Sequence, residues 1–330
     1  MREARQPTNP ARGGVTLLEL LIVITVLMML VGVALPTMKP ALEARQIREA
    51  ARSLNVYLGS ARSAAMVTGR PCGVMIQRLD VEPLCSMVLS QVQVPPPYAG
   101  DTLDARAVVK REGMANGIAT VSVKLSSFNA TLVNPGDLVQ FNHQGPMYTI
   151  TGGGDPNLTL QVDVSRGLQL PWPENGEESD PVPYKIFRSP MKSYATPMQL
   201  PGNAAIDLQF SGSEDHFLGA GLGGPIYIMF SPDGSVYRAY HDGNVHYVTE
   251  PIYLLVGRRD RIPEPTGSEL TDEVLPNYQD TRNFWLTLSP QTGLVTTVEV
   301  AAGPNNTTGI PADVQDSRSL AREAQSIGGR

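Results

Sequence analysis

Apolar residues are spread very unevenly along this chain. From Val15 to Leu35 nearly every position is apolar, and Glu19 is the one charged residue in that run. A helix of about 21 residues is roughly 31 Å long, which matches the hydrocarbon core of a bilayer. The pattern therefore predicts a membrane-spanning helix. Because an ionised carboxylate is costly in hydrocarbon, Glu19 is a candidate functional residue.

A second hydrophobic pattern follows the first. Apolar residues recur at steps of three and four, at Ile47, Ala51, Leu54, Leu58, Ala61 and Ala65. This spacing places them on one face of an amphipathic helix. Gly69 predicts the end of that helix, because glycine readily adopts the left-handed conformation, and Pro71 prevents its continuation. We expect one helix from Val15 to about Thr68, roughly 80 Å long.

Beyond Pro71, short runs of apolar and β-branched residues alternate with turn-forming residues, among them many of the 31 glycines and 28 prolines. Such runs are typical of antiparallel strands. The predicted strands are residues 72–76, 84–89, 136–141, 147–150, 158–162, 205–210, 226–230, 235–237, 284–288 and 294–300. The expected fold class is α+β, with the long helix packed on antiparallel β-sheets. For residues 313–327, a short helix and a disordered tail are both open.

Charge and motifs narrow the function classes. The chain has 26 Lys and Arg against 32 Asp and Glu, a formal net charge of −6, which gives no basic surface for nucleic acid. No glycine-flanked serine or phosphate-binding loop is found. The four histidines lack zinc-ligand spacing: His143, His216, His241 and His246. We expect no enzymatic activity, no cofactor and no metal.

One basic stretch, residues 258–261, contains three arginines. Two interpretations are open: a contact with phosphate or an acidic partner, and a solvated loop. In the second, the charge is offset by the acidic residues that follow, which are Glu264, Glu269, Asp272 and Glu273.

Arginines at positions 2, 5 and 12 precede the apolar run. By the positive-inside rule they keep the N-terminus cytoplasmic, so that everything after Pro36 lies outside. Disulfides persist in that compartment. Cys72 and Cys85 lie in consecutive predicted strands. A Cys72–Cys85 bridge across this hairpin and two buried free thiols are both open, because the sequence does not report their separation.

The stretch from Gly14 to Glu19, GVTLLE, preceded by a polar leader, resembles the processing signal of type IV pilins and type II secretion pseudopilins. The resemblance implies that a prepilin peptidase cuts after Gly14 and that Val15 becomes a methylated N-terminus. Phenylalanine is commoner at that position, so Val15 is a departure. Glu19 falls on the family's glutamate, which pairs with another subunit's terminal amine in the filament. Pro36 matches the proline that closes the membrane half of the helix.

Further along, residues 61–71, the following apolar strand and the turn from Ser231 to Gly234 resemble the H-type minor pseudopilins of the general secretion pathway. Typical members are much shorter, and residues 94–198 look like an insertion that forms a small β-barrel or sheet. The implied organisation is a leader (1–14), a membrane helix (15–36), helix and first hairpin of the head (37–93), the β-rich insertion (94–198), the remaining head strands (199–300) and a tail (301–330).

These resemblances imply a structural subunit: a minor pseudopilin or pilin-like protein of a type II secretion system, which exports proteins across the outer membrane. The alternative is a minor type IV pilin whose head serves adhesion or DNA uptake. The expected partners are the prepilin peptidase, other pseudopilins or pilins and the inner-membrane assembly platform. The expected location is the inner membrane, with a single pass and a periplasmic head.

Overall fold

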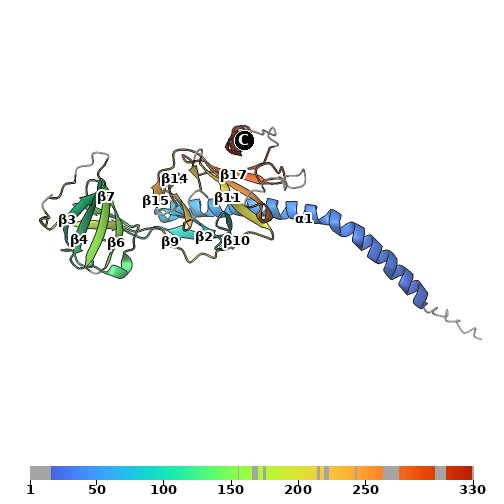
Figure 1. Ribbon diagram of the computed structural model, residues 1–330, viewed down its shortest axis with the longest axis horizontal. Helices are drawn as coiled ribbons and strands as arrows, with labels where there is room; N and C mark the ends of the chain where they lie inside the picture. The colour runs from blue at the N-terminus through green and yellow to red at the C-terminus, as the bar shows by residue number, and fades with distance from the viewer. Residues whose placement is uncertain are drawn as a thin grey trace, which may run out of the picture.

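The structure is a computed structural model. It describes residues 16–154, 156–165, 170–173, 176–213, 216–218, 223–241, 244–262, 275–301 and 310–328. Two bodies follow one another along a long axis, and a single helix projects from one end (Figure 1). We call the larger body, which contains the helix, the head. We call residues 98–187, the smaller β-rich body at the opposite end, the inserted barrel.

Helix α1 (Leu17–Thr68) is continuous over 52 residues, as the sequence predicts. It ends at Gly69, whose φ of 63° is the left-handed conformation of a helix C-cap. The N-terminal half leaves the head and bends (Figure 1). The prolines at positions 36 and 40 lie within the helix. A proline in a helix interior lacks the backbone N–H for one hydrogen bond and favours a kink.

The head is built on an antiparallel sheet of twelve described strands, in the order β15-β14-β13-β1-β2-β11-β16-β17-β18, with β9 and β10 paired to β2 and β12 to β11. Their bounds are β1 Cys72–Arg78, β2 Cys85–Gln93, β9 Met191–Lys192, β10 Met198–Gln199, β11 Ala204–Ser213, β12 His216–Phe217, β13 Ile226–Phe230, β14 Val236–His241, β15 Asn244–His246, β16 Ile252–Arg258, β17 Phe284–Leu288 and β18 Val295–Glu299. A short 3-10 helix, η2 (Arg259–Arg261), follows β16.

The C-terminal half of α1 covers one face of this sheet. All six residues of the predicted stripe are buried, and they pack against alternate residues of the strands, such as Val74, Ile206 and Leu254. The amphipathic pattern therefore identified the packing face of the helix correctly, and the α+β class is confirmed. Burying this stripe removes apolar surface from water, which is the main source of stability in the head.

A second helix, α2 (Ile310–Gly328), packs on part of the opposite face of the sheet. Val314 and Ala321 of α2 pack against Tyr253 and Trp285, which point away from α1. The indole nitrogen of Trp285 donates to Ser317 Oγ at 2.9 Å. Of the two descriptions left open for the tail, the helix is therefore the one observed.

The inserted barrel contains β3 (Ala107–Ala115), β4 (Ile118–Leu125), β5 (Leu138–Phe141), β6 (Tyr148–Gly154), β7 (Asn157–Asp163), β8 (Tyr184–Phe187) and the 3-10 helix η1 (Ala130–Leu132). The sheet order is β3-β4-β7-β6-β5-β8. Bridges from Ala107 to Val182 and from Lys110 to Glu178 bring the chain near β8 back to β3, so the sheet curls into a barrel. Its core, which includes Val121, is separate from that of the head.

The inserted barrel interrupts a β-hairpin of the head. Gln93 at the end of β2 pairs with Met191 at the start of β9, and Val92 pairs with Lys192. The chain therefore leaves the head and returns to it at neighbouring positions.

Candidate functional site

The N-terminus of α1 begins with a side-chain cap. Thr16 has extended backbone angles (φ −75°, ψ 151°), and its Oγ1 accepts a hydrogen bond from the Glu19 N–H at 3.2 Å. Threonine followed three residues later by glutamate is the spacing of a capping box. Glu19 also lies in the first turn, where the helix dipole favours a negative charge. Glu19 therefore has a local role in the helix, which the sequence interpretation missed. Gly14 and Val15 lie outside the described residues.

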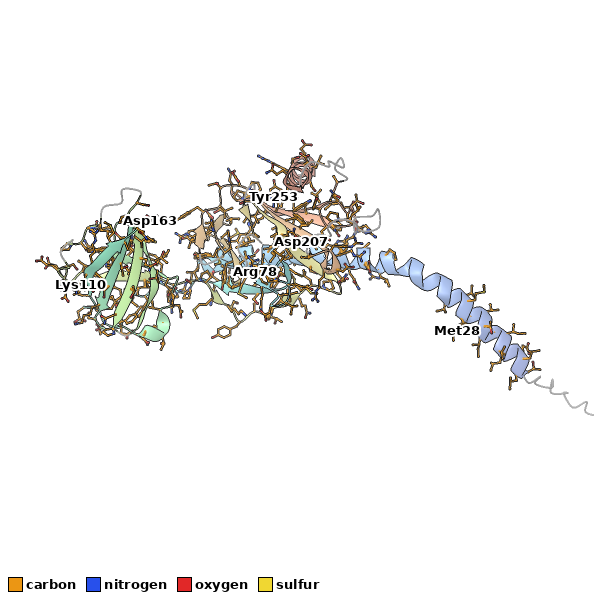
Figure 2. All side chains as sticks on the ribbon, viewed as in Figure 1. Met28, Arg78, Lys110, Asp163, Asp207 and Tyr253 are labelled. Carbon is orange, nitrogen blue, oxygen red and sulfur yellow. The ribbon has the colours of Figure 1, made fainter. Side chains whose placement is uncertain are left out.

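The N-terminal half of α1 presents a continuous apolar surface. The side chains from Leu17 to Gly32 are all exposed, including Leu17 at 82% and Met29 at 76%. Figure 2 shows these side chains, with Met28 labelled, spreading on all sides of a helix that no other element covers. Thr25 satisfies its hydroxyl by donating to the Leu21 carbonyl at 2.8 Å. A surface this apolar is typical of segments that contact lipid or other apolar helices.

Among the side chains that the structure describes, no helix is both long and apolar enough to cross a membrane.

The head holds α1 through polar contacts as well as through its apolar stripe. Arg258 Nη1 lies 3.0 Å from Glu43 Oε2, and both side chains are mostly buried. Arg62 Nε donates to the carbonyl oxygens of Gly234 and Thr292, each at 3.0 Å, and so joins the helix to two turns. These contacts add to the apolar packing that holds the C-terminal half of α1 on the head.

The basic stretch of residues 258–261 is paired within the protein, so the interpretation as a solvated loop is wrong. Arg258 contacts Glu43 and Asp260, and Arg259 Nε lies 2.8 Å from Glu82 Oε2. The hydrogen bond to Asp260 is the main cause that raises the pKa of Arg258 above its ordinary value. Arg261 is buried. The acidic residues that the sequence suggested as partners lie outside the described residues.

The bridge between Cys72 and Cys85 is not formed, because both cysteines are free and buried. Cys72 is the first residue of β1 and pairs with Gln93, the last residue of β2. Cys85 is the first residue of β2 and lies at the other end of the hairpin, next to the Arg78–Ser86 pair. In an antiparallel hairpin the two strand starts lie at opposite ends, here separated by roughly 20 Å at 3.3 Å per residue. Burial raises the pKa of Cys85 to about 12, so this thiol stays protonated and unreactive.

The histidines do not form a described metal centre. Within the part of the chain that the structure describes, no group of three or more His, Cys, Asp or Glu side chains could hold a metal ion. His143 is exposed in a loop. His241 and His246, from neighbouring strands β14 and β15, stack with ring centroids 4.1 Å apart. His216 lies in β12.

The comparisons with known proteins bear on the N-terminus. A family model described as "Prokaryotic N-terminal methylation motif" matches residues 9–35. This motif is typical of type IV pilins and pseudopilins and indicates a prepilin-peptidase substrate that assembles with other pilins. Neither the curated proteins nor the solved structures gave a match to the chain. The match contains Gly14, Val15 and Glu19, and it overlaps the exposed apolar half of α1.

Proposed function

We propose that this chain is a minor pseudopilin, a structural subunit of a type II secretion system that exports proteins across the outer membrane. The observation that carries the proposal is the coincidence of two features in the same segment. The methylation motif covers residues 9–35, and the side chains of residues 17–32 are exposed although almost all are apolar. Such a surface is stable in a bilayer before assembly and among other apolar helices in a filament.

The proposed topology follows from the same segment. The arginines of the leader keep the N-terminus in the cytoplasm, residues 15–36 anchor the chain in the inner membrane, and the head lies in the periplasm. The prepilin peptidase, other pseudopilins and the inner-membrane assembly platform are the proposed partners. In this role the chain performs no catalysis. The order of helix, hairpin and Ser231–Gly234 turn supports the narrower assignment to the H-type minor pseudopilins.

Processing is the first test. We expect cleavage between Gly14 and Val15 and methylation of the Val15 amine, because a small residue fits the peptidase pocket before the scissile bond. Gly14→Val should leave the precursor uncleaved in the membrane fraction. Gly13→Val is the matched control, since it makes the same change one residue earlier and should be processed. N-terminal sequencing and mass spectrometry of the mature chain measure both; a mature N-terminus other than Val15 would contradict the proposal.

A second candidate function is a minor type IV pilin that displays a binding head for adhesion or DNA uptake. The observation that favours it is the position of the inserted barrel, which lies at the end of the molecule opposite the projecting helix (Figure 1). Deleting the gene separates the two functions. Loss of secreted proteins with normal pili supports the pseudopilin, and loss of adhesion or DNA uptake with normal secretion supports the pilin.

A further inference from the structure

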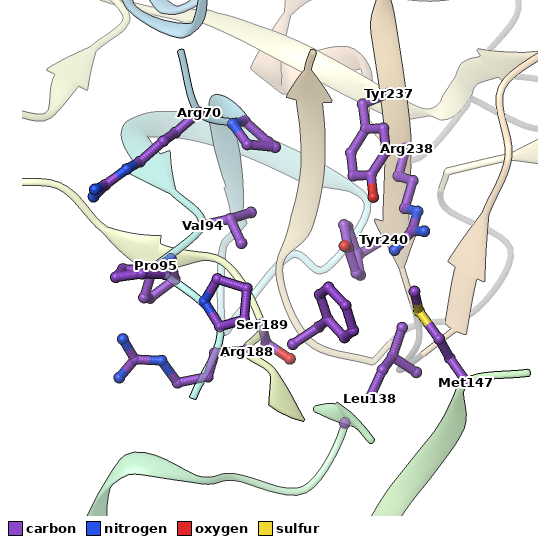
Figure 3. A pocket seen from close by; sticks show the side chains of 15 residues that line it. Arg70, Val94, Pro95, Leu138, Met147, Arg188, Ser189, Tyr237, Arg238 and Tyr240 are labelled. Atoms are coloured by element: carbon purple, nitrogen blue, oxygen red, sulfur yellow. The ribbon is translucent and has the colours of Figure 1, made fainter. Parts of the chain in front are cut away.

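A pocket of about 280 Å³ lies where the inserted barrel meets the head. Its head side comes from β14 and from the residues just before β1. Its barrel side comes from β5, from Met147 just before β6 and from the end of β8, and the consecutive prolines at positions 95–97 complete the wall. Figure 3 shows this arrangement. The pocket therefore exists only because the two bodies are placed against each other.

Among the residues that the structure describes, the charged residues lining this pocket are all basic: they are Arg70, Arg188 and Arg238. Figure 3 shows Arg70 and Arg188 extending on one side of the pocket and Arg238 on the other, beside Tyr237 and Tyr240. Val94, Leu138 and Phe187 supply much of the remaining wall. The pocket thus combines positive charge with an apolar surface.

Arg238 is held in a fixed position. Only 9% of the residue is exposed, and its guanidinium carbon lies 4.4 Å from the ring centroid of Tyr237 and 5.2 Å from that of Tyr247. One terminal nitrogen, Nη2, donates to Tyr247 Oη at 3.4 Å. The hydroxyl of Tyr240 is a further hydrogen-bonding neighbour. Two aromatic faces therefore orient this cation before any ligand arrives.

The hydrogen-bonding capacity of these arginines is incompletely used. The Nε atoms of Arg238 and Arg188 are both buried and have no hydrogen-bond partner among the described residues. Within the described part of the chain, neither guanidinium forms an ion pair with a carboxylate. Burying a cation without an anion is costly, and cation–π contacts offset only part of that cost. An acid group in the pocket would supply the absent partner, and a guanidinium can bind it with two parallel hydrogen bonds.

We propose that this pocket binds a small organic anion, with its acid group on Arg238 and its apolar body between Val94, Leu138 and Phe187. Arg188 and Arg70 add positive potential at the other side of the pocket. Because the walls belong to both bodies, the bound anion fixes the inserted barrel relative to the head. The ligand class is a carboxylate on an apolar or aromatic group.

Three probes test the class of ligand on the full-length chain in a neutral detergent: phenylacetate, its uncharged isostere phenylacetamide, and inorganic phosphate. Ligand-observed NMR titration measures each affinity. We expect phenylacetate to bind at least ten-fold more tightly than either of the others, because it alone offers both charge and an apolar ring. Equal binding of the amide would remove the role of charge, equal binding of phosphate would remove the role of the apolar wall, and either result overturns the proposal.

Variants locate the site. Arg238→Gln should weaken phenylacetate binding at least ten-fold without lowering the melting temperature of the ligand-free chain, because a neutral amide costs less to bury than an unpaired cation. Arg52→Gln, on the exposed face of α1, is the matched control and should bind normally. Met147→Glu, at the 40% exposed Met147 on the pocket wall, places a carboxylate there and should also block binding. Normal binding by Arg238→Gln would overturn the proposal. If Arg238→Gln does not fold, normal binding by Met147→Glu would overturn it instead.

Discussion

At the scale of a single residue, Glu19 has one observed role and one proposed role, and substitution can separate them. Its backbone N–H completes the cap made by Thr16 Oγ1, and its carboxylate lies in the first turn of α1. The proposed second role is the pairing of this carboxylate with another subunit's terminal amine in an assembled filament. The first role needs a residue compatible with a helix N-terminus, whereas the second needs a negative charge.

We therefore expect Glu19→Val and Glu19→Gln to be cleaved and inserted normally but incorporated poorly into the assembled structure, since both lack the charge. Glu19→Gln is the informative variant, because glutamine also fits a capping box. Cysteine crosslinking near position 19, together with a secretion or piliation assay, measures incorporation. Normal assembly by Glu19→Gln would refute the pairing role and leave capping as the function of this residue.

A second prediction at the residue scale concerns Gly293, where the structure leaves no room for a side chain. Its φ is +62°, and a Cβ added there would lie 2.0 Å from the Gly234 carbonyl oxygen, beside Arg62. We expect Gly293→Ala to lower the free energy of unfolding by about 2–3 kcal/mol through backbone strain and loss of this close contact. Chemical denaturation measures the change. Gly59→Ala in α1 is the control, because no atom lies within 4 Å of its added Cβ, and it should stabilise the chain by up to about 1 kcal/mol.

At the scale of elements, α1 has two faces with opposite requirements in the head. Leu58 is completely buried, whereas Val56, two residues earlier, is 71% exposed. We expect Leu58→Asp to unfold the head, because it buries an unpaired charge at a cost of several kcal/mol. Val56→Asp makes a similar chemical change at an exposed position and should leave the melting temperature almost unchanged. Equal effects of the two variants in thermal unfolding would show that the stripe does not bind α1 to the sheet.

Periodicity explains which elements could be predicted from the sequence. The stripe of α1 could be predicted because its apolar residues recur on one face of a helix. Strand β13 could be predicted because turn residues follow its apolar run. Strand β16 was missed: Leu254 faces α1 while Tyr253 and Leu255 face α2, so its sequence is a continuous apolar run without alternation. Such a run does not distinguish a strand from a short buried helix. Strands β3 and β4 of the inserted barrel were also missed.

The candidate site residues could also be predicted only in part from the sequence. Glu19 could be identified because a lone acid in an apolar run is conspicuous. The separation of Cys72 and Cys85 could not be read from the sequence, because it depends on the register of the hairpin. Arg238 was also missed. Its position between two tyrosine rings, one of them from a residue nine positions later, arises only when the chain folds. Residues whose roles depend on distant partners carry no local sequence signal.

At the scale of the whole molecule, the inserted barrel interrupts the head between two residues that pair with each other. Replacing residues 94–190 by an Asn-Gly turn would join Gln93 directly to its partner Met191. We expect this shortened chain to fold, because the core around α1 and the sheet remains complete. Each body has its own buried tryptophan, Trp285 in the head and Trp172 in the barrel.

Fluorescence of these tryptophans therefore reports on each body separately. The shortened chain should show a cooperative transition of Trp285 at nearly the wild-type temperature. The ends of the barrel meet at the Tyr98–Ile186 bridge. The isolated barrel should therefore show its own cooperative transition in the fluorescence of Trp172. A shortened chain with no cooperative Trp285 transition would show that the head depends on the barrel.

The position of this insertion also decides how the molecule carries force. The barrel is joined to the head at the end of β2 and at the start of β9, and these two strand ends pair with each other. A force on the barrel would therefore enter the head through both strands. Because β2 is paired along its length with β1, a pull along the strand axis would load the hydrogen bonds between β1 and β2 together in shear, rather than break them one after another as in unzipping.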